Sequence, residues 1–148
     1  MKQELLLLHH VAIQADAFYD DGERFGHWAA TALGGRRRAQ VTGLEGVANS
    51  TLKVSDVLDY LKKQTARSDV GEAWRHNNPE GKAFGPELIG FIRGQLRTRS
   101  ESICQSVAGD TKQTIEPTEK QQVYLALIRE FLRQVAAQYE LEVSRRDF

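Results

Sequence analysis

Residues 122–139, QVYLALIREFLRQVAAQY, carry the strongest structural signal in the chain. Their apolar positions recur three and four residues apart, which predicts a helix. These positions cover more than one side of that helix: Val123, Leu125, Leu127, Ile128, Phe131, Leu132, Val135 and Tyr139. A helix that is apolar on several sides lies in the middle of a bundle or at an oligomer interface. The segment therefore predicts either a central helix or a surface that docks on a partner.

The same spacing extends toward the N-terminus, and β-branched alternation is nearly absent. Turn or stop signals divide the pattern at Asp20-Asp21-Gly22, at Gly34, at residues 77–81 and at Gly109-Asp110. Thr42-Gly43-Leu44-Glu45 matches a capping box and predicts the start of the longest helix, which ends near residue 67. Residues 85–87 and 116–117 each place a proline at a helix start, and a short turn is expected around residue 74.

These elements predict an all-α, single-domain bundle of four to five helices over residues 1–148, with an edge strand over residues 4–13 as the alternative. Hydrophobic residues make up 41% of the chain and charged residues 27%, which is typical of a soluble domain. Cys104 is the only cysteine, so no internal disulfide can form, which favours a cytoplasmic location. The apolar run at residues 5–8 is too short to span a bilayer, so no membrane partner is expected.

Positive charge is concentrated in the middle of a neutral chain. Residues 36–99 contain 12 basic and 7 acidic side chains, and both flanking segments are acidic. Arginine pairs with phosphate oxygens in a bidentate geometry, so this segment predicts a site for a nucleic-acid backbone, RNA before DNA. The candidate phosphate-binding residues are Arg36, Arg37, Arg38, Lys53, Lys62, Lys63, Arg67, Arg93 and Arg97. The alternative is an ordinary solvated face, because Asp56 and Asp59 stand at helical spacing from the lysines.

Trp74, beside Arg75 and His76, is a candidate base-stacking residue if it is exposed. If instead it folds back on the bundle, it belongs to the core. The last helix supports a second functional hypothesis, in which the protein is an adaptor or homo-oligomer without nucleic acid. A third hypothesis is a small bundle enzyme or metal protein built around His9, His27 and the acids of residues 16–23.

The sequence offers little support for catalysis, a metal or a cofactor. It contains no phosphate-binding loop, nucleophile elbow or dinucleotide fingerprint. His9 and His10 are adjacent and point about 100° apart on a helix, so they cannot share one ion. Cys104 lies beside an apolar stripe, as a small buried hydrophobe would. We therefore expect a non-enzymatic protein with no catalytic residue, no metal and no cofactor.

The segment Arg38-Ala39-Gln40-Val41-Thr42-Gly43 follows an aromatic helix that contains Phe25 and Trp28. It resembles the Thr/Ser-Gln-Ile/Val-Arg motif at a helix start in the small helical subunits of type III CRISPR effector complexes, which serve antiviral defence. The resemblance covers roughly residues 25–107 and is mainly one of arrangement. No arginine follows Gln40-Val41, and the threonine comes after the glutamine, so no residue role is carried over. The resemblance implies a non-catalytic subunit that lines a guide–target path through backbone contacts.

Overall fold

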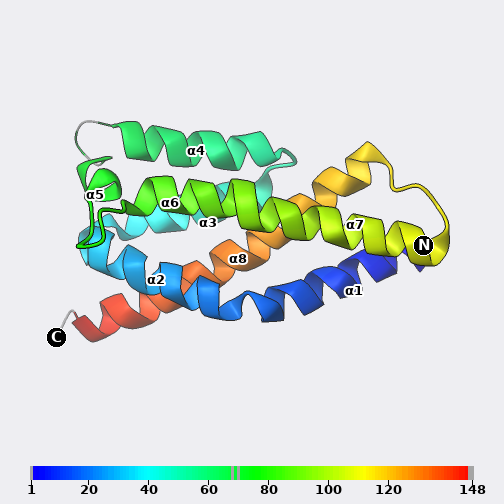
Figure 1. Ribbon diagram of the computed structural model, residues 1–148. Coiled ribbons are helices and arrows are strands. Elements are labelled where there is room, and N and C mark those ends of the chain that lie inside the picture. Colours follow the sequence, from blue (N-terminus) through cyan, green and yellow to red (C-terminus); the bar gives the residue numbers. More distant parts are fainter. Residues whose placement is uncertain (1, 68, 70, 147–148) are drawn as a thin grey trace.

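The computed structural model describes residues 2–67, 69 and 71–146, and within them every regular element is helical (Figure 1). In chain order the elements are α1 (Lys2–Ala17), α2 (Tyr19–Leu33), the 3₁₀ turn η1 (Gly35–Arg37), α3 (Arg38–Ser50), α4 (Val54–Ala66), α5 (Gly71–Arg75), α6 (Phe84–Phe91), the π-helical segment η2 (Ile92–Leu96), α7 (Arg97–Thr111) and α8 (Pro117–Arg146). Because α6, η2 and α7 are continuous, the described residues form seven helices. The all-α prediction is confirmed, the predicted count of four to five is too low, and the strand alternative for residues 4–13 is wrong.

Helix α8 is the centre of the bundle, as its apolar width predicts. It packs against α1, α2, α3 and α7, and Figure 1 shows it crossing the molecule diagonally. Phe131 is fully buried and its ring contacts the rings of Phe18, Phe25 and Phe91, with centroid distances of 5.8, 5.6 and 4.6 Å. Each buried aromatic ring removes a large apolar area from water, so this cluster joins α2, α6, α8 and the bend between α1 and α2 into one core. The core position of the last helix leaves little of it for a partner.

The closest helix crossing is between α2 and α8. Gly22 and Gly26 lie one turn apart on α2, against Gln134 and Gln138 of α8. The glycines leave room for the α8 backbone to approach, because a Cβ at either position would overlap α8. The predicted turn at residues 20–22 is therefore wrong, since these residues form the first turn of α2. The chain bends at Phe18 instead, and the early acids of α2 suit the positive end of a helix.

The predicted longest helix is two helices, α3 and α4, joined by residues 51–53. Thr42 and Glu45 lie inside α3, so the capping-box prediction is wrong. The real break is stabilised by Thr51, whose hydroxyl accepts from the backbone N–H of Lys53 at 3.0 Å and bonds the Asp56 carboxylate at 2.5 Å. Both helices face the same core, so the apolar periodicity runs through the break and hides it.

Other predicted boundaries agree closely with the structure. Helix α8 begins at Pro117, and α6 begins at Phe84, one residue before the predicted start. Gly34 ends α2 with φ at 63°, a value that favours glycine. The short helix α5 forms around Trp74. No helix within the described residues is both long and apolar enough to cross a membrane.

A four-residue repeat explains the π-helical segment. Leu88, Ile92, Leu96 and Ser100 are all buried and lie four positions apart. An α-helix has 3.6 residues per turn, so a strict four-residue repeat would drift around its surface. The i→i+5 bonding of η2 widens the turn and cancels part of that drift. The long helix from α6 to α7 can therefore keep one face on the core.

Candidate nucleic-acid interface

The hairpin of α3 and α4 brings most of the predicted phosphate-binding residues together. The hydroxyl of Tyr60 in α4 donates to the carbonyl oxygen of Gln40 in α3 at 2.8 Å. The end of α4 therefore lies beside the start of α3. Helix α5 lies at the same end, because Arg75 donates to the carbonyl oxygens of Thr65 and Arg67 at 2.6 and 2.9 Å. Figure 1 shows α5 with the end of α4 and the starts of α3 and α6 at this end.

We call the surface formed by Arg36, Arg37, Arg38, Lys62, Lys63 and Arg67 the basic end. These residues come from η1, the first residue of α3, the last turns of α4 and its C-cap. The remaining three predicted residues are elsewhere. Lys53 precedes α4 at the opposite end of the hairpin, and Arg93 and Arg97 lie on the long helix near Tyr124. The structure thus divides the predicted set and does not place it on one continuous surface.

Ion pairing divides the predicted residues further. Three of them face acids: Arg38 pairs with Glu140 at 3.0 Å, and Lys53 and Arg97 pair with acids three and four residues further along the chain at 3.6 and 3.3 Å. By contrast, the other exposed cations of the predicted set form no ion pair with any residue that the structure describes. They are Arg36, Lys62, Lys63, Arg67 and Arg93. The predicted pairing of the lysines with Asp59 does not form. An exposed ion pair contributes at most about 1 kcal/mol, so the pair between Arg38 and Glu140 does not prevent an external anion from binding at the basic end.

A groove of about 520 Å³ runs along the last turns of α4 at the basic end, lined by Tyr60, Lys63, Gln64, Ala66 and Arg67. Burial raises the pKa of Tyr60, against the opposing charge of Arg67, so the hydroxyl stays a neutral donor. The lining therefore combines two neutral polar side chains, Tyr60 and Gln64, with the cations of Lys63 and Arg67. Such a groove suits a negatively charged chain.

Trp74 belongs to the core, which is one of the two alternatives that the sequence left open, and it is therefore not a stacking platform. Its side chain is 0% exposed and packs on Phe84, with 5.2 Å between ring centroids. The indole N–H donates to Oε1 of Gln40 at 2.6 Å, which satisfies the one polar group that the ring would otherwise bury. Trp28 on α2 is the second aromatic residue, after Tyr60, that lines a hollow at this end. The sequence did not single it out as a site residue, and its partial exposure has no local sequence signal.

The histidines and acids of the third hypothesis do not gather into a site. Among the described residues, no cluster of three or more His, Cys, Asp or Glu could hold a metal ion. His27 instead forms a 2.6 Å contact between its Nδ1 and Oε1 of Glu142. Hydrogen bonds from this imidazole and Gln138 lower the pKa of Glu142, although burial opposes that shift. His27 thus links α2 to the last turns of α8.

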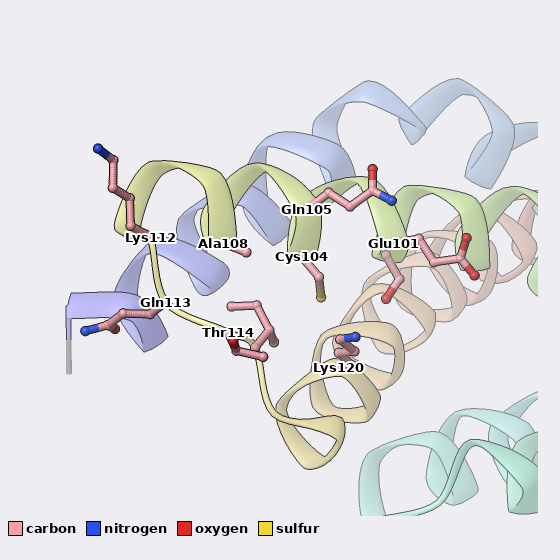
Figure 2. Close-up of a pocket in the computed structure, with 10 residues that line it drawn as sticks. Glu101, Cys104, Gln105, Ala108, Lys112, Gln113, Thr114 and Lys120 are labelled. Atoms are coloured by element: carbon pink, nitrogen blue, oxygen red, sulfur yellow. The ribbon is translucent and has the colours of Figure 1, made fainter.

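A second cavity, of about 490 Å³, lies far from the basic end, between α7 and the start of α8. Figure 2 shows the sulfur of Cys104 pointing into it, with Thr114 and Lys120 on the facing side. Burial raises the pKa of the Cys104 thiol, and the charge of Lys120 only partly opposes that effect. The group is therefore protonated at neutral pH, which is the less nucleophilic form. The buried position agrees with the sequence prediction for this residue.

No protein-family model, curated protein or solved structure matches this chain. The likeness to small CRISPR subunits stays a prediction from the residues quoted above. Any functional conclusion must therefore come from the geometry of the chain itself.

Proposed function

We propose that this protein binds the backbone of a single-stranded nucleic acid, RNA before DNA, at its basic end. In this proposal it acts as a non-enzymatic subunit of a larger assembly, of the CRISPR effector type that the sequence resembles. The observation that carries the proposal is that Arg36, Lys62, Lys63 and Arg67 stand at the same end of the α3–α4 hairpin, exposed and without an ion pair among the described residues. Cations left without acids at one end of a neutral protein attract a polyanion.

In this proposal the predicted residues contribute unequally to phosphate binding. The four unpaired residues of the basic end supply the main phosphate contacts, and Arg37 and Arg38 stand beside them. Arg38 can exchange Glu140 for a phosphate, because both partners are about half exposed and such pairs are weak. Lys53, Arg93 and Arg97 belong to other surfaces and add at most long-range attraction. Such contacts position a strand and carry no base specificity.

Fluorescence anisotropy with a labelled single-stranded RNA tests the proposal through its salt dependence. Each phosphate contact to a single strand contributes about −0.7 to the slope of log affinity against log salt, so four contacts predict about a 50-fold loss between about 50 and 200 mM salt. Replacing Arg36, Lys63 and Arg67 by alanine should weaken binding and reduce the slope by about 2.

A charge-matched control separates local contacts from net charge. Lys53, Arg97 and Arg133 are also exposed, but each pairs with an acid three or four residues away along the chain. Their triple alanine variant removes the same charge and should keep most of the affinity and the slope. Equal losses in the two variants, or binding that does not respond to salt, would overturn the proposal.

A second candidate function, protein–protein association, is favoured by α1 and not by α8. Leu5, Leu8 and Ile13 on α1 are 67%, 55% and 49% exposed. Large apolar side chains gathered on one helix are typical of an interaction surface. Light scattering over a wide concentration range tests whether this face joins copies of the chain, and a Leu5→Glu, Leu8→Glu variant should abolish any dimer. A strict monomer that binds no partner would count against this function.

A further inference from the structure

The cavity beside Trp28 adjoins the basic end and has a volume of about 580 Å³. Three parts of the chain enclose it: the last turns of α2, Arg37 of η1, and α5 with the segment 76–79. That segment is held in one shape, because Oδ1 of Asn78 accepts the backbone N–H groups of Glu80 and Lys82 at 2.9 and 3.0 Å. An antiparallel bridge between Asn77 and Ala83 closes the same turn. The cavity is therefore preformed, which lowers the entropic cost of binding.

One wall of the cavity is aromatic and rigid. The indole of Trp28 stacks on Phe25 with a centroid distance of 5.9 Å and an interplanar angle of 25°. It also meets the ring of Phe84 edge-on at 6.0 Å. The two phenylalanines are buried and hold Trp28, which is itself only half-buried and lines the cavity. A flat ligand that covers the accessible part of this indole gains stacking energy without first ordering the side chain.

The rest of the lining offers hydrogen-bonding groups that are not used inside the protein. The Glu72 carboxylate, the His76 ring, the Asn77 amide and the indole N–H of Trp28 form no hydrogen bond with any described residue. The NH₂ of Asn78 is equally free, since only its oxygen is engaged. Donors and acceptors thus converge on one aromatic-walled cavity, which is typical of a site that fixes the orientation of a small planar ligand.

Charge decides which part of a nucleotide fits. Glu72 and Arg37 both line the cavity, so the carboxylate repels a phosphate on the α5 side, and the guanidinium attracts one on the η1 side, where the cavity adjoins the basic end. A carboxylate accepts two adjacent N–H groups, and guanine presents such a pair on its Watson–Crick edge, at N1 and N2. Adenine and cytosine offer an exocyclic amine, and uracil offers only N3–H.

We propose that this cavity binds one unpaired nucleobase, with guanine preferred, stacked on Trp28 and hydrogen-bonded to Glu72. The inference rests on the proposed function, because the base would belong to the strand whose phosphates lie on the basic end. It gives a backbone-binding protein one point of base selection. It also makes Trp28 the stacking residue in place of Trp74.

Nucleosides test the cavity separately from the backbone site, because they carry no phosphate. Guanosine, adenosine, cytidine and uridine are titrated into the full chain while tryptophan fluorescence is followed. Guanosine should quench most strongly and uridine least. A Trp28→Phe variant should lose the quenching, since Trp74 is fully buried and cannot report contact.

The Glu72→Gln variant keeps the shape of the side chain and removes its charge. It should weaken guanosine binding by about ten-fold, the range expected for discrimination by one bidentate contact, and leave uridine nearly unchanged. Glu80→Gln, an exposed acid on the neighbouring turn, is the matched control and should change neither. Equal quenching by all four nucleosides, no quenching, or equal effects of the two variants would overturn the inference.

The outcomes for the two sites are distinguishable. Salt-sensitive RNA binding without nucleoside binding would leave the backbone proposal standing and overturn the cavity. Guanosine binding that depends on Glu72, without salt-sensitive RNA binding, would support the cavity and overturn the backbone site. If both sites operate, a strand with one guanine should bind more tightly than oligouridine in the native protein and equally in Glu72→Gln.

Discussion

Gly26→Ala should destabilise the protein, although alanine is the better helix former. A Cβ at this position would lie 2.4 Å from Cβ of Gln138 and 2.7 Å from the carbonyl oxygen of Val135. Neither atom can rotate away, because one is backbone and the other is fixed to it, so α2 and α8 must separate. Overpacking costs about 1–3 kcal/mol and the gain in helix propensity is at most about 1 kcal/mol. We therefore expect a net loss of about 1–2 kcal/mol in the free energy of unfolding.

Gly46→Ala is the matched control for this prediction. Gly46 lies inside α3 and a Cβ there meets no atom within 4 Å. The same substitution should stabilise the protein by about 0.5–1 kcal/mol, through helix propensity and a less flexible unfolded chain. Urea denaturation followed by circular dichroism measures both free energies. The two variants should differ in sign.

The result that would refute this reasoning is a Gly26→Ala variant as stable as Gly46→Ala. It would mean that α2 and α8 do not cross as closely as described. The aromatic cluster around Phe131 would then need a different arrangement, because α2 supplies Phe25 to it. An unchanged midpoint with a lower slope would instead indicate a change in the surface exposed on unfolding.

Three further predictions concern single side chains. Trp74→Phe should cost about 2 kcal/mol in urea denaturation, because it leaves a void and an unpaired Gln40 oxygen; no loss would show that the indole is exposed. Burial raises the pKa of Cys104, so its labelling by Ellman's reagent at about pH 8 should be slower than the labelling of a free cysteine. The rate should increase once the pH exceeds the ordinary pKa of a thiol. Equal rates for Cys104 and a free cysteine would contradict the buried position. Burial opposes ionisation of Glu142, but its contact with His27 helps to keep its folded pKa below the ordinary 4.5. The ionised carboxylate therefore stabilises the fold above about pH 4.5, and this stabilisation is lost as the pH falls through the folded pKa. His27→Ala should therefore be less stable than the native protein near pH 6 and converge with it in acid, and parallel pH profiles would disprove the link.

Local sequence signals predicted those features that depend on one helix alone. The apolar width of residues 122–139 predicted that α8 is either central or a docking surface, and its central position is one of these two alternatives, while Pro117 predicted where the helix begins. The break at Thr51 was missed because α3 and α4 bury the same face, so the periodicity is continuous across it. Gly22 was read as part of a turn, whereas the four-residue spacing to Gly26 is the signal of a close helix crossing.

The candidate site depends on contacts that the sequence cannot reveal. Basic residues can be counted along the chain, but Arg38 is paired with an acid 102 positions away, so only the fold separates paired from free cations. The sequence singled out Trp74, beside Arg75 and His76, as the candidate stacking residue and gave no such role to Trp28. What distinguishes them is Gln40, which satisfies the indole of Trp74 and buries it.

The π-helical segment has a consequence for how the long helix tolerates length changes. It holds one more residue than an ordinary turn, so it acts as a built-in insertion. Deleting Gly94 would let residues 84–111 form one regular α-helix and would leave the residues after the deletion in nearly the same orientation relative to α6, because the segment loses only its extra residue. Ile103 and Val107 would therefore stay in the core. The same deletion in an ordinary turn of α7 would rotate everything after it by about 100°, so the helix tolerates the loss of one residue only at its π-helical segment.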